Sequence, residues 1–337
     1  MSWDASFQKP SVYLTTSNHG KISSLLKNKG EKMEYMIAVD AGGTKTESVA
    51  YSMDGQVLAE QKAAFGNILI DPELALNHIC ESIEQLLLQL APDDCNMLVL
   101  GIAGSDSKKH ESLIQQRLEK FKLPFLVTND AYLAHAAYFK GESGVLTIAG
   151  TGAVSIAVNA DKKAMLGGWG HLLGDEGSGY WLAISAIKLA ILQFERNASS
   201  SSALTESILD FYQLKNLSEV KNIVYGGSKA DVASLVPTLV SLANEGNKEV
   251  ATLFEAAAQE LSALTARAIE KAELMDAPIV AIKGSILTYI ESIQVAFIKN
   301  VRQVYPNVQF ITEDLSSTLG GFYLSQKETS TPGIDML

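Results

Sequence analysis

The chain has 337 residues, 47% of them hydrophobic, and a formal net charge of −11 at pH 7. Its length predicts about two domains, and its apolar content is sufficient for two hydrophobic cores. An acidic chain without a cluster of lysines and arginines argues against binding to nucleic acid or to an anionic membrane, and no apolar run approaches the roughly 18 residues of a membrane span.

Residues 1–32 differ from the rest of the chain. They lack the basic start and apolar core of a signal peptide and show no sustained periodicity, so we expect them to be loosely ordered. Codons for residues 29–33 can spell a purine-rich ribosome-binding site in front of a start codon. We therefore hypothesise that Met33 or Met36 is the physiological start, and recovery of Met1 by N-terminal sequencing of the native protein would contradict this.

The stretch 36–51, MIAVDAGGTKTESVAY, predicts two antiparallel strands joined by a tight glycine turn. Glycines allow the backbone to approach a ligand closely. Gly42, Gly43 and Thr44 are therefore candidates to direct N–H groups at phosphate oxygens, and we expect a positive φ at Gly43. Asp40, at the end of a buried strand, is a candidate to hold the water shell of Mg²⁺. An ordinary hairpin turn is the alternative interpretation.

The following segments alternate between strands and helices. Asp71 and Pro72 are typical of an N-cap followed by the first helical turn. The expected strands are 57–63, 97–102 and 125–128, and the expected helices are 72–90, a helix that ends near 120, and 131–139. This alternation predicts a mainly parallel sheet covered on both faces, with ligands at the carboxyl ends of the strands.

The strand-to-glycine pattern returns twice in the second half. The stretch 145–158 is again strand, turn and strand, with GTG at 150–152, and 279–287 is an apolar strand that runs into Gly284, Ser285 and a helix. Short glycine motifs recur by chance, but three of them separated by helical segments indicate a shared site.

Between these two stretches lies 167–181, GGWGHLLGDEGSGYW, with six glycines. Such a loop is costly in backbone entropy unless it shapes a site. A helix is expected to about 195, then a serine-rich link at 199–202 and further helices. A long helix over 248–274 has its apolar residues on one face, and a last helix is expected at 319–324.

The three turns, in this order, resemble the two phosphate loops and the adenosine loop of the actin, sugar kinase and heat-shock chaperone superfamily. The resemblance covers residues 36 to about 327. It implies an α/β fold of two ribonuclease H-like (actin-like ATPase) domains around an interdomain nucleotide cleft. The domains would be 34–145, with a C-terminal helix at about 318–328 packed back on them, and 146–317, after a leader at 1–33.

Within that superfamily, the chain resembles the N-acetylglucosamine kinase group and its bacterial relatives in the BadF/BadG/BcrA/BcrD ATPase-type family. GGWGHLLGDEGSGYW is the most specific motif, beside TNDA at 128–131, the DAGGTKT loop and the GTG loop. The resemblance implies that Asp130 is the catalytic base. The implied sugar contacts are Asn67, Asp130, Gly168, Trp169, Gly170 and Asp175. The implied ATP contacts are Gly43, Thr44, Thr151, Gly152, Gly284 and Ser285, with Mg²⁺ at Asp40.

The chemistry of the reaction points to Asp130 independently, because a hydroxyl that attacks a γ-phosphate needs a carboxylate to accept its proton. The alternative for Asp130 is a helix N-cap, a role that Asn129 fills equally well. Asp175 has a capping alternative too, at the helix that follows it. Trp169 either covers the apolar face of a sugar or wedges the loop into the core, and His171 is interpreted as a loop-packing residue.

These features predict a cytoplasmic, ATP- and Mg²⁺-dependent kinase of an amino sugar, N-acetylglucosamine or a close relative such as N-acetylmuramic acid. The family often has Ser-Asn where this chain has Ala153 and Val154, so the exact sugar stays open. The expected partners are the sugar and ATP, and the oligomeric state, a homodimer included, is also open.

The chain lacks the sequence features that three rival functions would require. An ATPase that activates a dehydratase through a shared iron–sulfur cluster needs cysteine ligands, and neither Cys80 nor Cys95 follows a loop suited to bridging a cluster. The spacing of these cysteines is typical of reduced thiols in a cytosolic protein. A repressor-related glucokinase would carry a zinc-binding cysteine cluster, and an actin-like or chaperone module would carry a filament insert or a peptide-binding domain.

Overall fold

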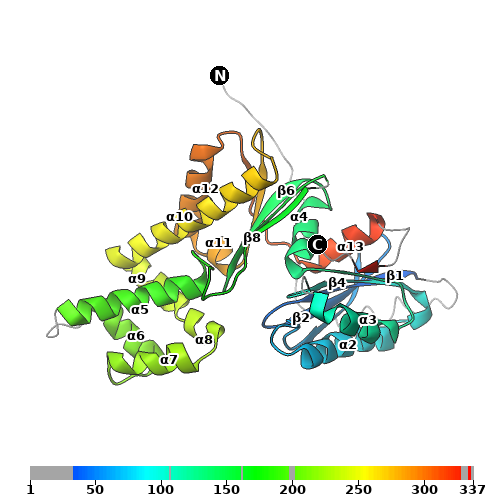
Figure 1. Cartoon of the computed structure of the whole chain (residues 1–337), viewed down its shortest axis with the longest axis horizontal. Helices are drawn as coiled ribbons and strands as arrows, with labels where there is room; N and C mark the ends of the chain where they lie inside the picture. Colours follow the sequence, from blue (N-terminus) through cyan, green and yellow to red (C-terminus); the bar gives the residue numbers. More distant parts are fainter. Residues whose placement is uncertain (1–32, 106–107, 161, 197–201, 328–332, 335–337) are drawn as a thin grey trace.

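The computed structural model describes residues 33–105, 108–160, 162–196, 202–327 and 333–334, which form two α/β lobes (Figure 1). The expected leader at 1–32 and most of the serine-rich link lie outside the described residues. None of the described helices is long and apolar enough to cross a bilayer. Each lobe is built on one β-sheet, and each sheet contains one of the two predicted glycine hairpins.

The N-terminal lobe contains a six-stranded sheet. Its strands run in the order β11 (Gly333–Ile334), β5 (Phe125–Thr128), β4 (Cys95–Ile102), β1 (Tyr35–Ala41), β2 (Thr46–Ser52) and β3 (Val57–Ala63). β1 pairs parallel with β4 and antiparallel with β2, and β2 pairs antiparallel with β3. The sheet is therefore mixed. Its pairings from β11 through β5 and β4 to β1 are parallel, as expected, and those along β1–β2–β3 are antiparallel because each tight turn reverses the chain.

Alternate residues of β1 pack on opposite faces of this sheet. Ile37 and Val39 face a core made with α2 (Pro72–Gln89) and α3 (Glu111–Glu119). Ala38, one residue along, faces a core made with α4 (Asp130–Phe139) and α13 (Thr318–Lys327). Side chains alternate along a strand, so β1 packs into a core on each face of the sheet. Packing on both faces holds β1 in place, and its carboxyl end lies at the rim of the lobe.

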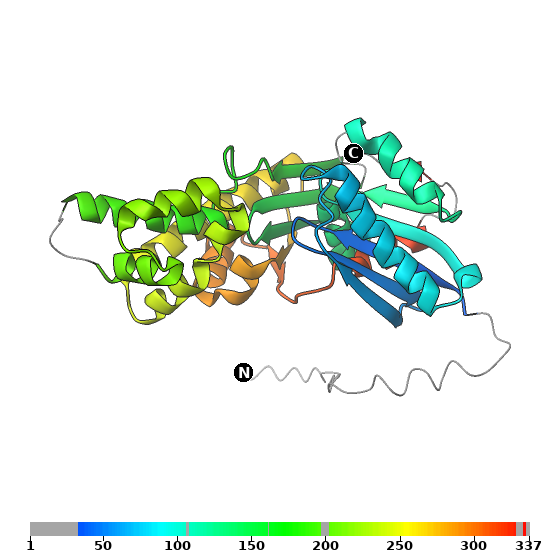
Figure 2. The same cartoon turned by 90° about the horizontal axis from the view of Figure 1, so that it is seen from below.

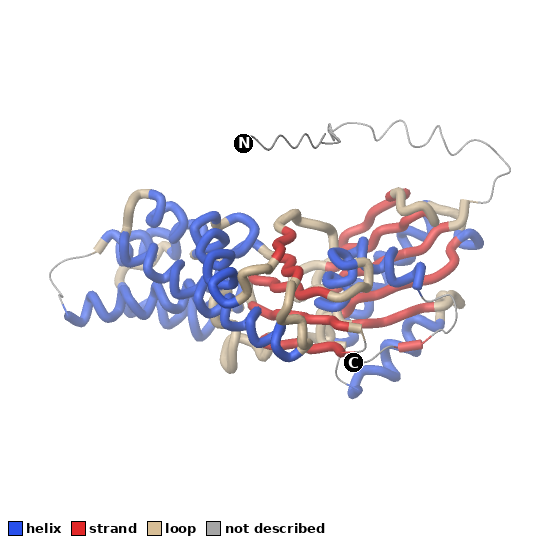
Figure 3. Tube along the Cα trace, turned by 90° about the horizontal axis from the view of Figure 1, so that it is seen from above, coloured by secondary structure: helices blue, strands red, loops and turns tan. Residues whose placement is uncertain are grey.

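The C-terminal lobe has a five-stranded sheet and a larger set of helices. Its strands run in the order β10 (Gln309–Ile311), β9 (Ile279–Lys283), β6 (Gly144–Ala149), β7 (Ala153–Asn159) and β8 (Lys162–Gly167). The described helices of this lobe are α5 (Gly179–Arg196), α6 (Ala203–Tyr212), α7 (Val220–Gly226), α8 (Lys229–Ala233), α9 (Val236–Asn244), α10 (Lys248–Lys271), α11 (Ser285–Tyr289) and α12 (Glu291–Val304). Helices α5–α9 gather at the end of the molecule away from the N-terminal lobe (Figures 2 and 3).

The predicted long amphipathic helix is confirmed as α10. The Asn247 side chain accepts the backbone N–H groups of Glu249 and Val250 and so starts the helix. Its predicted apolar face is buried in the core of the C-terminal lobe, as expected for a helix that packs on a sheet. The N-cap predicted at Asp71 is also confirmed, since its side chain accepts the Leu74 N–H over 3.0 Å.

Helix α4 connects the two lobes. Its Leu133 packs in the N-terminal lobe, whereas Ala134 and Ala137 pack against Leu146 and Ala281 of the second sheet. The chain crosses back after β10 to form α13, which packs beside α4 on the first sheet. The two sheets are therefore joined through the same central helix.

Acid should weaken the packing of α4 against the second sheet through His135, a residue of α4 that is only 2% exposed. The neutral ring donates to the Gly144 carbonyl at the start of β6, with 3.0 Å between the Nε2 and O atoms. Burial lowers the pKa of His135 from 6.5 to about 4. Below pH 6.5 the unfolded chain therefore binds a proton that the folded protein does not, and stability falls as the pH drops toward 4.

We expect the free energy of unfolding to fall by about 2 kcal/mol between pH 7 and pH 5 from this group alone. Urea unfolding of wild type and His135→Gln at both pH values checks it, because other titrating groups contribute equally to both proteins. An equal loss of stability in the two proteins would contradict the assignment.

Candidate active site

The first glycine turn joins β1 to β2 at the rim of the N-terminal lobe. The Gly42 N–H donates to the Lys45 carbonyl over 3.0 Å, and the Gly66 N–H donates to the Gly42 carbonyl over 2.9 Å. Gly43 and Thr44 are exposed at the tip of the turn. The expectation of a positive φ at Gly43 is wrong, because Gly43 is not among the glycines with a positive φ. A Cβ added at Gly43 would also meet no atom within 4 Å.

Asp40 lies beside this turn, at the end of β1. Burial raises the pKa of its carboxyl group, whereas a hydrogen bond with the Ser317 side chain and the positive charge of Lys283 lower it. Mg²⁺ is held by one or two carboxylates together with waters and substrate phosphates. A single carboxylate fits that pattern, and the described residues contain no group of three or more acidic, His or Cys side chains that would hold a metal alone.

Asn67, in the loop between β3 and α2, and Asp130, at the start of α4, lie at the same rim. The Asn67 side-chain oxygen accepts the Leu69 N–H over 2.9 Å, which shapes its turn. The Ile68 N–H donates to the Ala103 carbonyl over 3.2 Å, and this bond draws the turn to the carboxyl end of β4. Asp130 begins α4 shortly after β5, and β5 pairs with β4 on the side opposite β1.

Asn129 is the N-cap residue of α4. Its side-chain oxygen accepts the Ala131 N–H over 2.9 Å, and Asn129 has the extended backbone of a cap. Asp130 is the first helical residue, and its Oδ1 also lies 3.0 Å from the Ala131 nitrogen. The capping role is therefore filled without Asp130, whose proposed catalytic role stays a prediction.

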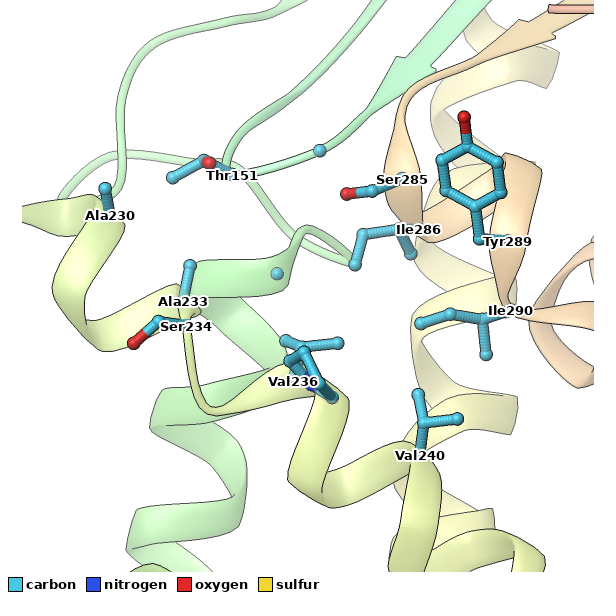
Figure 4. Close-up of a pocket in the computed structure, with 13 residues that line it drawn as sticks. Thr151, Ala230, Ala233, Ser234, Val236, Val240, Ser285, Ile286, Tyr289 and Ile290 are labelled. Carbon is cyan, nitrogen blue, oxygen red and sulfur yellow. The ribbon is translucent and has the colours of Figure 1, made fainter. Parts of the chain in front are cut away.

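The second glycine turn and the Gly284 turn meet in the C-terminal lobe. Thr151 and Ser285 line the same cavity of about 480 Å³. In Figure 4 these two residues lie along the upper edge, with Val236 and Val240 of α9 below them. A polar edge above an apolar floor suits a ligand that combines phosphates and ribose with a flat apolar ring.

Gly284 holds these two turns together. It has a φ of 90°, and a Cβ at this position would lie 2.4 Å from the carbonyl oxygen of Ala149, which precedes the second turn. Predicted nucleotide contacts from segments more than 130 residues apart in the sequence are thus brought into one cavity.

The glycine-rich loop 167–178 is tied to the second turn near both ends. The Gly168 N–H donates to the Ala153 carbonyl over 3.0 Å, and the Gly179 N–H donates to the Gly150 carbonyl over 2.8 Å. Trp169 is 75% exposed, so the alternative that it wedges the loop into the core is wrong.

Around this loop, a second cavity of about 370 Å³ is lined by Trp169, Asp175 and Glu176, with Glu260 and Arg267 of α10. The cavity places charged side chains beside an exposed ring, an arrangement that suits a polar ligand with an apolar face.

Two further residues of the loop are placed by their contacts. The His171 ring packs edge-on against Tyr180 at 4.6 Å, as expected for a loop-packing residue. Asp175 does not cap α5 with its side chain, because Ser178 accepts the Trp181 N–H there over 3.2 Å.

Asp175 is instead buried, at 3% exposure, and both of its carboxylate oxygens have partners. Oδ1 accepts the Ala153 N–H over 3.0 Å, and Oδ2 pairs with the Lys229 ammonium over 2.5 Å. The sequence interpretation missed Lys229. Nothing in the local pattern distinguishes this lysine from others on helix surfaces, and its partner lies 54 residues away.

The predicted site residues therefore form two groups, one on each lobe. The N-terminal lobe carries Asp40, Gly43, Thr44, Asn67 and Asp130, and the C-terminal lobe carries Thr151, Gly152, Gly168, Trp169, Gly170, Asp175, Gly284 and Ser285. Lys283, at the end of β9, is close enough for its charge to act on Asp40 of the other group. It donates to Asp314 and to the Leu315 carbonyl, in the segment that returns the chain to the N-terminal lobe.

The family model for the BadF/BadG/BcrA/BcrD ATPase family matches residues 37–314. The chain belongs to this family. The resemblance seen in the glycine-rich motifs is thereby confirmed.

Two relatives of this BadF/BadG/BcrA/BcrD family member match over nearly their whole length. The N-acetylmuramic acid/N-acetylglucosamine kinase of Clostridium acetobutylicum is 29% identical over 305 residues, which cover 88% of this chain and 99% of the relative. The N-acetyl-D-glucosamine kinase of Dictyostelium discoideum is 27% identical over 318 residues, which cover 87% and 98%.

Solved structures confirm the predicted fold class for the family member. A Chromobacterium violaceum protein, provisionally described as an N-acetylglucosamine kinase, has a TM-score of 0.68 at 24% identity and covers 87% of this chain and 99% of its own. A ROK family glucokinase from Streptomyces griseus, solved with glucose and AMPPNP, has a TM-score of 0.55 at 18% identity, with coverage of 86% and 98%.

Proposed function

We propose that this protein is an ATP-dependent kinase that phosphorylates a hydroxyl group of an amino sugar, N-acetylglucosamine or a close relative such as N-acetylmuramic acid. One observation carries the proposal. Thr151 and Ser285 line one cavity suited to a nucleotide, in a chain that aligns with nearly the full length of two amino-sugar kinases. The site residues below are assigned as part of this proposal.

Asp130 accepts the proton of the attacking sugar hydroxyl. Asp130 lies on the first turn of α4, after β5, at the same end of the sheet as the phosphate turn at Gly43 and Thr44 that follows β1. Phosphoryl transfer needs little covalent chemistry from the protein, so positioning and charge neutralisation supply most of the rate enhancement. The sugar is oriented by Asn67, Asp130, Gly168, Trp169, Gly170 and Asp175.

The nucleotide binds between the two lobes. Gly43, Thr44, Thr151 and Gly152 direct backbone and hydroxyl groups at the phosphates, and Gly284 and Ser285 contact the adenosine. Asp40 holds the hydration shell of Mg²⁺, which when bound neutralises charge on the transferring phosphoryl group. Because the two groups of residues lie on separate lobes, bound substrates draw the lobes together and exclude water.

The cellular setting follows from the same proposal. The enzyme works in the cytoplasm, where ATP is available and where free thiols such as those of Cys80 and Cys95 stay reduced. ATP and the sugar are its partners, and a homodimer would show as twice the chain mass of 36.2 kDa in light scattering.

The alternative function, an ATPase that activates a dehydratase through an iron–sulfur cluster, is not favoured by the cysteines. Both Cys80 and Cys95 are buried, and burial raises the pKa of Cys95 to about 12. Cluster ligands are thiolates and must be accessible to the cluster.

A coupled assay of ADP release over a panel of amino sugars and plain hexoses, with a no-sugar control, tests the proposed function. We expect turnover only with N-acetylated amino sugars or close relatives. Equal turnover with and without sugar would refute the kinase and favour the ATPase.

A further inference from the structure

The Asp175–Lys229 ion pair joins two segments that have separate tasks in the proposed function. Asp175 lies near the end of the glycine-rich loop assigned to the sugar, and Lys229 begins helix α8. The pair is largely enclosed, since the side chains of Asp175 and Lys229 are 3% and 30% exposed. A buried carboxylate that loses its cation is left with an uncompensated charge, so the two residues are constrained to stay together.

Helix α8 forms part of the nucleotide cavity. Ala230 and Ala233, which follow Lys229 on the helix, line this cavity and lie on its wall opposite Ser285 in Figure 4. The start of the helix is held by a capping box in which the Ser228 and Asp231 side chains each bond the other's backbone N–H. A ligand that contacts Ala230 and Ala233 therefore also fixes the position of Lys229.

Asp175 also binds the strand that follows the second turn. Its Oδ1 accepts the Ala153 N–H, while the Ala153 carbonyl accepts the Gly168 N–H, so the loop holds the strand that follows the second turn from both sides. Space around the pair is tight, because a Cβ at Gly152 would lie 2.7 Å from the Lys229 nitrogen and 3.0 Å from Asp175 Oδ1. Neither residue can move far without moving the turn.

We infer that Lys229 is a positioning residue that couples the nucleotide cavity to the amino-sugar loop, so that occupancy of one site tightens binding at the other. The coupling is expected to be positive because of the loop's composition: its many glycines lose conformational entropy when the loop is ordered. A nucleoside that fixes α8 supplies part of this ordering through Lys229 and Asp175, and the sugar then loses less entropy on binding. This inference rests on the proposed function.

The experiment measures the dissociation constant of N-acetylglucosamine by calorimetry, with and without saturating adenosine. Under the proposed function adenosine occupies the C-terminal cavity, and it carries no phosphate to bridge the lobes, so its effect cannot arise from the turn at Gly43. In the wild type we expect adenosine to tighten sugar binding by about 5-fold or more, in the range typical of coupled sites. In Lys229→Met we expect the ratio of the two constants to fall to within about 1.5-fold of unity.

Two controls separate coupling from a loss of structure. Lys221→Met removes an exposed lysine from the neighbouring helix α7 and should keep the wild-type ratio. Asp175→Asn keeps an acceptor for the Ala153 N–H but removes the charge, and it should abolish the coupling as Lys229→Met does. If Lys229→Met is too unstable to assay, Asp175→Asn carries the test alone.

The outcomes are distinct. A folded Lys229→Met or Asp175→Asn protein that keeps the wild-type ratio, even at lower absolute affinities, would overturn the coupling and leave the kinase assignment intact. The same holds for a wild type that binds both ligands independently. A wild type that binds no sugar of the amino-sugar panel would overturn both the coupling and the proposed function.

Discussion

Replacing Asp130 by Asn should lower kcat by about 10²- to 10⁴-fold, the usual loss when a general base is removed. The substitution keeps the shape of the side chain and its acceptor for the Ala131 N–H, 3.0 Å away, but removes its basicity. Proton removal can come late in a loose phosphoryl-transfer transition state, so we expect a value near the lower end. The affinities for sugar and ATP should change much less, because binding depends mainly on Asn67, the glycine-rich loop and the phosphate turns.

The helix-capping alternative predicts a different result for the same variant. Asn129 already caps α4, and Asp and Asn cap about equally well, so a purely structural role would make the exchange silent. Asp71→Asn is the matched control, since Asp71 is the N-cap of α2 and should tolerate the exchange with its melting temperature unchanged. Steady-state kinetics and thermal unfolding of both variants check the prediction. A folded Asp130→Asn enzyme with near wild-type turnover would eliminate Asp130 as the base.

Replacing Gly284 by Ala should weaken both folding and nucleotide binding. Its φ of 90° with ψ of 153° belongs almost only to glycine, and forcing another residue into such a region costs about 1–3 kcal/mol. The added Cβ would also lie 2.4 Å from the Ala149 carbonyl oxygen, which would separate the strand end from the second turn. We expect ATP affinity to fall more than 10-fold, because Ser285 would no longer face Thr151 across the cavity.

Gly43→Ala is the contrasting variant at the first turn. Gly43 has no positive φ and open space around its Cα, so the melting temperature should stay within the range of ordinary surface substitutions. Gly43→Val, with a bulkier side chain at the turn, should lower ATP affinity sharply while the protein stays folded. Thermal unfolding and nucleotide titration of the three variants test this. A Gly284→Ala protein with wild-type stability and affinity would refute the role of that turn.

Local patterns were sufficient for most of the elements that carry the site. The hairpins at 36–51 and 145–158 and the strand before Gly284 were predicted because alternating apolar residues and glycine turns encode backbone conformation directly. The N-cap at Asp71 and the buried face of α10 follow from equally local rules. The sign of φ at Gly43 was predicted wrongly, because glycine adopts either sign and only the surrounding turn selects one.

By itself, the sequence determined that this is an α/β protein with three glycine turns, a glycine-rich loop and a carboxylate at the start of α4. The tertiary structure decided which of these meet. It placed Thr151 and Ser285 in one cavity, assigned the cap of α4 to Asn129, and turned Asp175 inward onto Lys229. The reason is physical: backbone preference is set by neighbours along the chain, whereas a buried carboxylate must find a cation wherever the packing of distant helices delivers one.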